Sequence, residues 1–344
     1  MTTTEPILRL DHLVKQFPIK AGVLRRTVGQ VHAVSDVSLD LFGEETLGVV
    51  GESGCGKTTL GRTVLRLIEP TSGTITFQGR DITHIGKAEM RAVRRDLQIV
   101  FQDPYASLNP RMSVREIVGE PLRIQGVDKG ETRERVAEML QAVGLLPEHG
   151  NRYPHEFSGG QRQRIGIARA ITVHPKVLIL DEPVSALDVS IQAQVLNLLE
   201  DLQERFELSM IFIAHDLSVV RHISDRVAVM YLGRVVELTG RDTLYEDPAH
   251  PYTHSLLSAV PVPDPRAERT RQRIVLQGDV PSPASPPPGC HFHTRCPIAT
   301  ERCRIEVPLL VPIDGDTLHQ VACHYPLHAG ETLLERVSQV AVTR

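Results

Sequence analysis

A glycine-rich stretch near the N-terminus, GESGCGKT, constrains the fold of this chain more than any other feature. It covers residues 51–58 and directly follows the short apolar run at residues 47–50. After it, apolar residues recur at helical spacing, at Leu60, Val64, Leu67 and Ile68. We therefore expect a strand, a tight loop and a helix in direct succession, as in α/β proteins.

Two further apolar runs predict a parallel sheet. KVLILDEP, at residues 176–183, and MIFIAHD, at residues 210–216, are short apolar runs that end in polar residues. Strands that are covered on both faces do not alternate apolar and polar residues, so these runs fit buried parallel strands. Residues 190–206, between the two runs, have helical periodicity. Because ligands of such sheets bind beyond the C-terminal ends of the strands, these polar residues are candidates for a site.

Other segments alternate or are helical. Leu8–Phe17, Val31–Leu41 and Gly73–Gly79 predict a smaller antiparallel sheet, and residues 226–240 predict a hairpin that turns at Leu232-Gly233. Helical patterns dominate from about residue 87 to residue 164, with no strong strand after Phe101, which predicts a helical insertion.

The 344 residues exceed what one compact core usually holds, and the composition changes late in the chain. VPVPDPR, at residues 260–266, and VPSPASPPPG, at residues 280–289, predict extended, stiff connectors. We therefore expect a large domain at residues 1–247 and an extension at residues 248–344.

The composition argues against two classes of protein. A net charge of -4, 4% aromatic residues and no Trp give no reason to expect a nucleic-acid partner. No run approaches the roughly 18 apolar residues of a membrane span, and the charged N-terminus does not resemble a signal peptide. We expect a cytoplasmic chain that reaches a membrane only by docking on other proteins.

The stretch at residues 51–58 fits G-x-x-x-x-G-K-[ST], the phosphate-binding P-loop. Its glycines let backbone N–H groups approach phosphate oxygens, and the N-terminus of the following helix favours an anion. Lys57 is expected to reach the β- and γ-phosphates and Thr58 to ligate Mg²⁺. The alternative is a glycine turn that happens to precede a helix. Cys55 is interpreted as a bystander in the loop.

An acidic pair ends the strand VLILDE, where Asp181 and Glu182 stand side by side. Asp181 is placed to hold Mg²⁺ and Glu182 to polarise an attacking water, the division of roles that phosphoryl transfer needs. The alternative is a pair that caps the following helix; the P-loop upstream favours the catalytic interpretation.

The segment FSGGQ precedes a predicted helix and carries no nucleophile or acid–base pair. Ser158 and Gln161 have the spacing of a capping box, and the two glycines leave backbone N–H groups open to an anion. Because the P-loop already supplies one phosphate-binding helix, a second one makes sense if it serves a nucleotide held by another chain.

Together these motifs resemble the ATP-binding subunits of ABC transporters, over about residues 8–240. The resemblance assigns motifs in order: the adenine-stacking aromatic to Phe17, Walker A to Gly51–Thr58, the Q-loop to Gln102, the signature motif to Ser158–Gln161 with Phe157 in place of Leu, Walker B to Val177–Glu182, the D-loop to Ser185–Asp188, and the switch histidine to His215.

The resemblance implies an α/β P-loop NTPase fold of the ABC type, with a mixed sheet core, an antiparallel β subdomain, a helical subdomain and a small C-terminal Cys-containing domain. It implies catalysis by Glu182, His215 and Gln102 and Mg²⁺ binding by Thr58, Gln102 and Asp181. The ATP-binding residues that it implies are Phe17, Gly51, Glu52, Ser53, Gly54, Cys55, Gly56, Lys57, Thr58, Thr59, Ser158, Gly159, Gly160 and Gln161.

Three stretches carry a closer resemblance, to the oligopeptide/dipeptide/nickel importers, extending to about residue 326: GESGCGKTTLGR, VFQDPYASLNPRMSV and EDPAHPYTHSLLSAVP. It implies peptide uptake through two permease subunits, a second ATP-binding subunit packed head to tail (often a paralogue), an extracytoplasmic binding protein and a place at the cytoplasmic face of the cell membrane. Nickel or another small solute as cargo, and a soluble ABC ATPase that transports nothing, are the alternatives.

Four cysteines lie in the C-terminal extension with the spacing C-x5-C-x6-C-x19-C: Cys290, Cys296, Cys303 and Cys323. A reducing compartment favours a metal or cluster site over disulfides, and the close C-x2-4-C pairs typical of structural zinc are absent. Some relatives carry a [4Fe–4S] cluster on such cysteines, and four thiolates suit it. Zinc, with a nearby histidine, and unligated or disulfide thiols remain alternatives.

Overall fold

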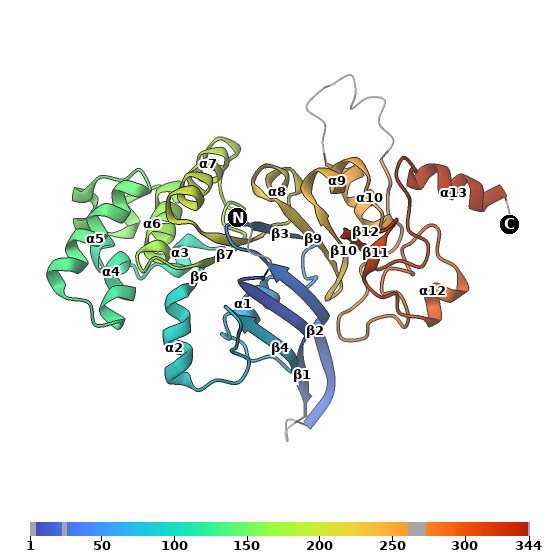
Figure 1. The fold of residues 1–344 in the computed structure, drawn as a ribbon, viewed down its shortest axis with the longest axis horizontal. Helices are drawn as coiled ribbons and strands as arrows, with labels where there is room; N and C mark the ends of the chain where they lie inside the picture. The colour runs from blue at the N-terminus through green and yellow to red at the C-terminus, as the bar shows by residue number, and fades with distance from the viewer. Residues whose placement is uncertain (1–4, 23–25, 261–272, 343–344) are drawn as a thin grey trace. The chain divides into compact units, whose positions relative to one another are not determined.

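The computed structural model describes residues 5–22, 26–260 and 273–342. The chain forms two compact units, each assembled from several segments (Figure 1). Unit 1 comprises residues 1–8, 40–46 and 76–214, and unit 2 comprises residues 9–39, 47–75 and 215–344.

Unit 1 is built on three parallel strands, β6 (Leu97–Val100), β7 (Val177–Asp181) and β8 (Ser209–Ile213). Ile179 of the central strand pairs with Ile99 on one side and Ile211 on the other. Every residue of β7 and β8 is buried, which confirms that their uninterrupted apolar runs are buried parallel strands.

The strand β6 lies inside the range predicted as a helical insertion. It has only four residues and begins directly after a helix, so it is too short to show a strand pattern. The remainder of the range is helical: α2 (Lys87–Asp96), α3 (Pro104–Ser107), α4 (Val114–Ile124), α5 (Lys129–Ala142), the 3₁₀ turns at Pro147–Asn151 and Pro154–Glu156, and the first half of α6 (Gly159–Ile171). Helix α7 (Val189–Phe206) then leads from β7 to β8.

Unit 2 contains a mixed set of strands. The strand β3 (Thr46–Val50) pairs in parallel with β9 (Arg226–Tyr231), which pairs antiparallel with β10 (Arg234–Gly240). The predicted hairpin is confirmed, because Leu232 and Gly233 both adopt positive φ, 45° and 80°, at its turn. Two further antiparallel strands continue the series, β12 (Asp316–Val321) and β11 (Val311–Ile313).

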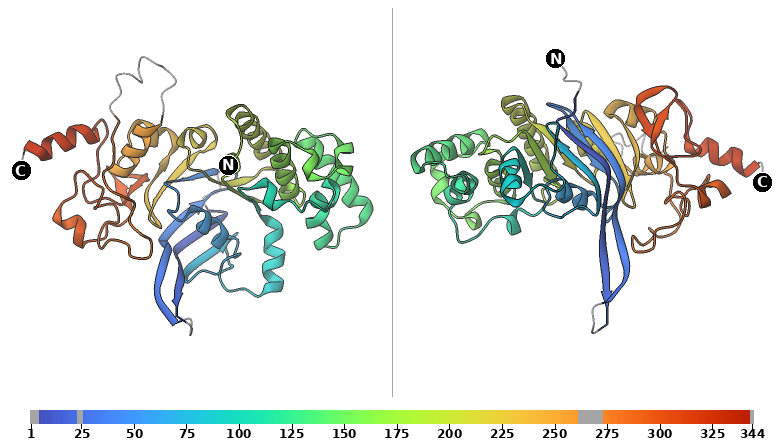
Figure 2. Two further views of the ribbon diagram at one scale, coloured as in Figure 1. Left: turned by 180° about the vertical axis from the view of Figure 1, so that it is seen from behind. Right: turned by 60° about the horizontal axis from the view of Figure 1, so that its bottom comes forward.

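The alternating N-terminal segments form strands of a second sheet, as predicted, in the order β2 (Arg26–Leu41), β1 (Leu8–Ala21), β4 (Ser72–Phe77) and β5 (Arg80–Asp81). Figure 2 shows β1 and β2 as two long neighbouring strands. Both exceed their predicted lengths, because alternation marks only the part of a strand that has a buried face.

The other helices of unit 2 are short: α1 (Lys57–Val64), α8 (Leu217–Ile223), α9 (Arg241–Glu246), α10 (Pro251–Ala259), α12 (Glu301–Ile305) and α13 (Leu333–Val342). Residues 280–289 form neither helix nor strand, whereas residues 261–266 of the first proline-rich stretch lie outside the described residues. Because β12, at residues 316–321, pairs with β10, unit 2 continues across the predicted boundary at residue 247, which stays a prediction.

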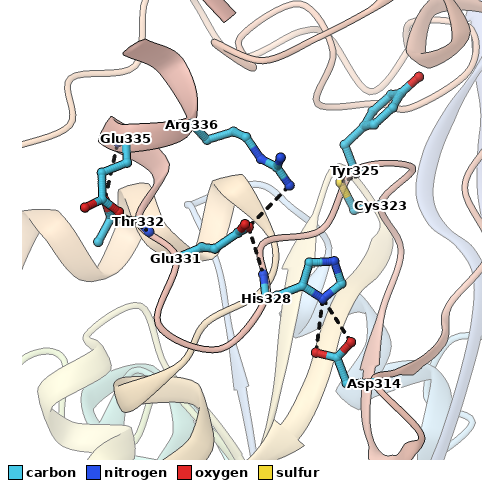
Figure 3. A network of polar contacts seen from close by, with 8 residues as sticks. All are labelled: Asp314, Cys323, Tyr325, His328, Glu331, Thr332, Glu335 and Arg336. Carbon is cyan, nitrogen blue, oxygen red and sulfur yellow. Dashed lines mark hydrogen bonds and ion pairs between the residues drawn. The ribbon is translucent and has the colours of Figure 1, made fainter. Parts of the chain in front are cut away.

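Polar contacts order the end of the extension (Figure 3). The His328 ring contacts both carboxylate oxygens of Asp314, at 2.9 and 3.1 Å from Nδ1. Glu331 accepts from the His328 backbone N–H and from Arg336. These contacts fix the chain that follows Cys323 and Tyr325.

Within the described part of the chain, every helix is too short or too polar to cross a membrane.

Candidate functional site

The loop at residues 51–58 joins β3 to α1 in unit 2, as the sequence predicts. Lys57 is 4% exposed, and its Nζ donates to the carbonyl oxygens of Gly51, at 2.7 Å, and Glu52, at 3.1 Å. Burial raises the pKa of the neighbouring Cys55 thiol, which keeps it neutral and fits its interpretation as a bystander. The lysine thus lies across its own loop.

Backbone conformation makes glycine necessary at the start of the loop. Gly51 has a φ of 151°, and a Cβ there would lie 2.1 Å from the carbonyl oxygen of Met230 in β9. That oxygen belongs to the backbone of a buried strand and cannot move aside. Hydrogen bonds close the loop further, since Gly233 N–H donates to the Cys55 carbonyl at 2.8 Å.

The rest of the loop is accessible where a ligand would enter. Ser53 and Gly54 are exposed, and Gly56, Thr58 and Thr59 are half-buried. Gly56 caps α1 in the left-handed conformation without any side-chain cap, so the first turn of the helix is not covered by a serine or aspartate. Such a helix start suits an anion.

Glu52 connects this loop to the C-terminal extension. The guanidinium of Arg295 forms a bidentate ion pair with its carboxylate, at 2.7 and 3.1 Å. The Tyr252 hydroxyl accepts from the Glu52 backbone N–H at 2.9 Å. The contact with Glu52 raises the pKa of Arg295, so the guanidinium stays charged. Sequence reasoning missed both partners, because 200 and 243 positions separate them from Glu52 and no local pattern joins them.

The acidic pair at the end of β7 lies in unit 1. Asp181 is 1% exposed, whereas Glu182 is half-buried and adopts a φ of 48°, which is unusual for a residue other than glycine. Gln102 donates its amide to the Glu182 carboxylate at 2.9 Å. The structure thus brings Gln102 and Glu182 together, as one shared role in catalysis would require, and the strained backbone is typical of functional positions.

The segment FSGGQ also lies in unit 1 and caps α6 as predicted. Gln161 N–H donates to the Ser158 hydroxyl at 3.3 Å, and Ser158 N–H donates to the Gln161 side chain at 3.1 Å. Both residues are exposed, while Phe157 is buried against His149. A Cβ on Gly160 would lie 2.4 Å from the Ile191 side chain. The exposed cap leaves the first turn of α6 open to an anion.

Three other predicted residues have ordinary surroundings. Asp188 caps α7, since its carboxylate accepts from Ile191 N–H at 3.0 Å, and this contact lowers its pKa. His215 is exposed in the bend between β8 and α8. Phe17 is half-buried in β1 with the Lys15 ammonium 5.0 Å from its ring centroid. Each side chain lies where a ligand or a second chain could reach it.

The structure collects the four C-terminal cysteines around one small cavity, together with His250, His293 and His324. All four are free thiols, which excludes the disulfide alternative in this structure. Burial raises the pKa of Cys296 to about 12, and it raises the pKa of Cys323 as well. Among the described residues, no three His, Cys, Asp or Glu side chains are arranged to hold one metal ion. The thiols therefore surround a space and do not converge on a point.

Comparison with protein families identifies two regions of the chain. Residues 34–185 match the ABC transporter family, and residues 236–303 match the C-terminal region of oligopeptide/dipeptide transporters. The first match covers the P-loop, the segment FSGGQ and the acidic pair.

Curated relatives match along nearly the whole chain. The oligopeptide transport ATP-binding protein AppF of Bacillus subtilis is 57% identical over 93% of this chain and 97% of its own length. A probable peptide ABC transporter ATP-binding protein of Sinorhizobium fredii is 54% identical over 93% of this chain and 90% of its own.

Solved structures agree on the fold. The ATP-binding cassette MJ0796, dimeric and bound to ADP and Pi, has a TM-score of 0.61 and 28% identity over 68% of this chain and 98% of its own. The cbiO1 protein of Clostridium perfringens, part of an ABC transporter complex, has a TM-score of 0.61 and 28% identity over 71% of this chain and 92% of its own.

The fold is therefore the α/β P-loop NTPase fold of ABC ATPases, with its mixed sheet, its antiparallel sheet and its helical elements. With the family match, the long relatives and the loop geometry in agreement, the chain belongs to the ATP-binding subunits of ABC transporters, in the branch that imports peptides, and it is an ATPase.

Proposed function

We propose that this chain binds and hydrolyses ATP, with Mg²⁺, to drive the uptake of dipeptides or oligopeptides. The observation that carries the proposal is the 57% identity to an oligopeptide transport ATP-binding protein along nearly the whole chain, C-terminal region included. Nickel or another small solute is the alternative cargo.

In this proposal the described residues divide the work on ATP. Lys57 exchanges its contacts with the Gly51 and Glu52 carbonyls for contacts with the β- and γ-phosphates. Thr58, Gln102 and Asp181 hold Mg²⁺, which neutralises phosphate charge.

Glu182 orients and polarises the attacking water. Gln102, whose amide is hydrogen-bonded to the Glu182 carboxylate, contacts the same water. His215 contacts the γ-phosphate, Phe17 stacks on the adenine, and the remaining loop residues contribute backbone N–H groups. Phosphoryl transfer depends mostly on such positioning and charge neutralisation, so no covalent intermediate on the protein is needed.

A second ATP-binding subunit completes the site. The open first turn of α6, at Ser158–Gln161, closes on the γ-phosphate in the P-loop of a partner that packs head to tail. The dimer of the solved relative MJ0796, which binds ADP and Pi, supports the proposal of a second subunit. The partner is a paralogue or a second copy, and either would place two nucleotides between the two chains.

Membership of this family supports the remaining proposed partners. Two permease subunits form the pore, an extracytoplasmic protein delivers the substrate, and the chain docks at the cytoplasmic face of the cell membrane. Mass spectrometry of the membrane complex captured with this subunit should identify two multi-span permeases beside a peptide-binding protein. A complex without permeases would favour a soluble ATPase, and a nickel-binding partner would favour nickel as cargo.

The substitution Glu182→Gln tests the catalytic assignment. It keeps the size of the side chain and removes the charge that polarises water, so ATP binding should persist while turnover falls by about a hundredfold or more. The variant should also accumulate as an ATP-bound dimer, visible by light scattering. Glu204→Gln, at an exposed position of α7, is the matched control and should hydrolyse ATP normally. Near-normal hydrolysis by Glu182→Gln would remove Glu182 from this role.

We also propose that the four C-terminal thiols hold a [4Fe–4S] cluster. The support for this proposal is that all four cysteines line one cavity and that four thiolates are the ligand set of such a cluster. The cluster would brace the extension and take no part in ATP hydrolysis.

Anaerobic purification tests the cluster. The protein should be brown, absorb near about 400 nm and contain iron and acid-labile sulfide, and Cys296→Ser should lose the colour. Stoichiometric zinc in a colourless preparation would contradict the proposal.

A further inference from the structure

Glu52 joins the P-loop to chain outside the loop through both its side chain and its backbone. Its carboxylate binds Arg295, its backbone N–H donates to Tyr252, and its carbonyl accepts from Lys57 at 3.1 Å and from Cys55 N–H at 3.2 Å. The side chain, the N–H and the carbonyl of this one residue are therefore all fixed. Two of these four partners, Arg295 and Tyr252, come from the C-terminal part of unit 2.

The contacts to Glu52 are built on a rigid base. The Arg295 side chain is 9% exposed and lies over the Tyr231 ring, 6.0 Å from its centroid. Tyr231, Tyr252 and Phe292 pack on one another with centroids 4.7 to 5.4 Å apart, and all three are at most 1% exposed. A bidentate guanidinium–carboxylate pair on such a base fixes orientation as well as distance.

We propose that Arg295 and Tyr252 are positioning residues of the nucleotide site, which hold the P-loop through Glu52 in the conformation that accepts ATP. Neither residue needs to touch the nucleotide. The inference rests on the proposed role of the P-loop, at Gly51–Thr58. It also gives the C-terminal extension a role, because the extension supplies the two residues that hold the loop.

The physical effect is preorganisation. A glycine-rich loop samples many conformations, and its apparent affinity for a ligand falls in proportion to the fraction that is competent to bind. Removing the support lowers that fraction in the free protein. Once ATP is bound, its phosphates order the loop, so the rate at saturating ATP changes little. The expected signature is a raised KM with a preserved kcat.

The experiment measures ATP hydrolysis and the binding of a fluorescent ATP analogue by the purified chain with Mg²⁺. Arg295→Met keeps the apolar stem and removes the ion pair, and it should raise KM and Kd about tenfold while kcat stays within about twofold. Tyr252→Phe keeps the ring packing and removes the acceptor of the Glu52 N–H, and it should raise KM about threefold. Loss of folded protein alone would lower the apparent kcat and leave KM unchanged.

A charge exchange and a matched control complete the test. The double variant Glu52→Arg with Arg295→Glu should have a KM well below that of Arg295→Met and close to that of the parent, because the ion pair is restored with its charges exchanged. Arg302→Met removes an exposed ion pair with Glu306 in the same extension and should change neither constant.

Two outcomes would contradict the inference: KM within about twofold of the parent in both Arg295→Met and Tyr252→Phe, or equal KM increases in Arg302→Met and Arg295→Met. Lys57→Ala separates this failure from failure of the P-loop itself. If Lys57→Ala loses ATP affinity while the Arg295 and Tyr252 variants do not, only the support is wrong. If Lys57→Ala binds ATP normally, the proposed P-loop role is wrong.

Discussion

The two glycine-containing helix starts of this chain are held in opposite ways. The P-loop before α1 has no side-chain cap and is fixed by distant residues, with Arg295 and Tyr252 on Glu52 and the Gly233 N–H on Cys55. The segment before α6 is fixed only locally in its cap, by Ser158 and Gln161, and both residues are exposed.

The difference corresponds to the two roles proposed for them. A loop that binds phosphate within its own chain gains from support on its far side, because its conformation is set before the ligand arrives. A helix start that serves a nucleotide on another chain must remain exposed until that chain docks. The following predictions test this comparison.

The largest effect is expected at Gly51. In Gly51→Ala the new methyl group meets the Met230 carbonyl oxygen, a backbone atom, at 2.1 Å. The free energy of unfolding should fall by about 3 kcal/mol, and ATP affinity should fall with it. The matched variant Gly160→Ala meets the Ile191 Cγ2 methyl group at 2.4 Å, a side-chain atom and not the backbone, and should lose less, about 1 to 2 kcal/mol. Equal losses in chemical denaturation would break the comparison.

Gly160→Asp places a carboxylate at the open first turn of α6. It should lower ATP hydrolysis by about a hundredfold, because a negative charge and a lost anion contact oppose the γ-phosphate of the partner site. Binding of the ATP analogue to the single chain should remain unchanged, since the P-loop is intact. Reduced affinity in the isolated chain would show that the two helix starts are not independent.

Ser158→Ala removes only the local cap of α6. We expect a loss of about 1 kcal/mol in the free energy of unfolding, the usual cost of an exposed N-cap serine. Thermal unfolding of the variant beside Thr300→Ala, whose side chain makes no cap hydrogen bond at α12, provides the measurement. A loss as large as that of Gly51→Ala would mean that Ser158 has contacts beyond its own helix.

Acid should weaken the support of the P-loop and spare the α6 cap. Burial lowers the pKa of His250 to about 4, against the opposing influence of Glu237 and with the help of His254. The neutral ring accepts the Tyr252 N–H at 3.0 Å and caps α10, which the protonated ring cannot do. Because the unfolded chain takes up the proton first, stability is complete above pH 6.5 and falls as the pH drops towards 4.

The expected loss between pH 7 and pH 6 is about 0.7 kcal/mol, the smallest of these effects. Denaturation at the two pH values measures it. His250→Gln should remove that part of the pH dependence, whereas His222→Gln, at an exposed position, should retain it. An unchanged pH dependence in His250→Gln would exclude His250 as its source.

Local patterns predicted the local features well. The strand–loop–helix of the P-loop, the Ser158 cap and the turn at Leu232-Gly233 depend on neighbours within a few residues, and the structure confirms them. The strand β6 escaped prediction because four residues carry too little periodicity.

Contacts between distant residues could not be predicted in this way. Glu52 and Arg295 lie 243 positions apart, and neither segment indicates the other; Gln102 and Glu182, 80 positions apart, were assigned to one site by the family resemblance and not by a local pattern. Such contacts depend on the tertiary fold, which is determined by the whole sequence together and not by any short segment of it. The four cysteines were predicted to share one site, and the structure places all four around one cavity, but their spacing in sequence could not predict the shape of that cavity.

The positive φ of Glu182 implies that stability and catalytic activity make opposite demands on this position. A glycine at this position would relax the backbone and raise the free energy of unfolding by about 1 kcal/mol, yet it would remove the carboxylate that we propose acts on water. The more stable variant would be the inactive one. Screens for heat-resistant variants should therefore enrich substitutions at position 182 that silence the enzyme.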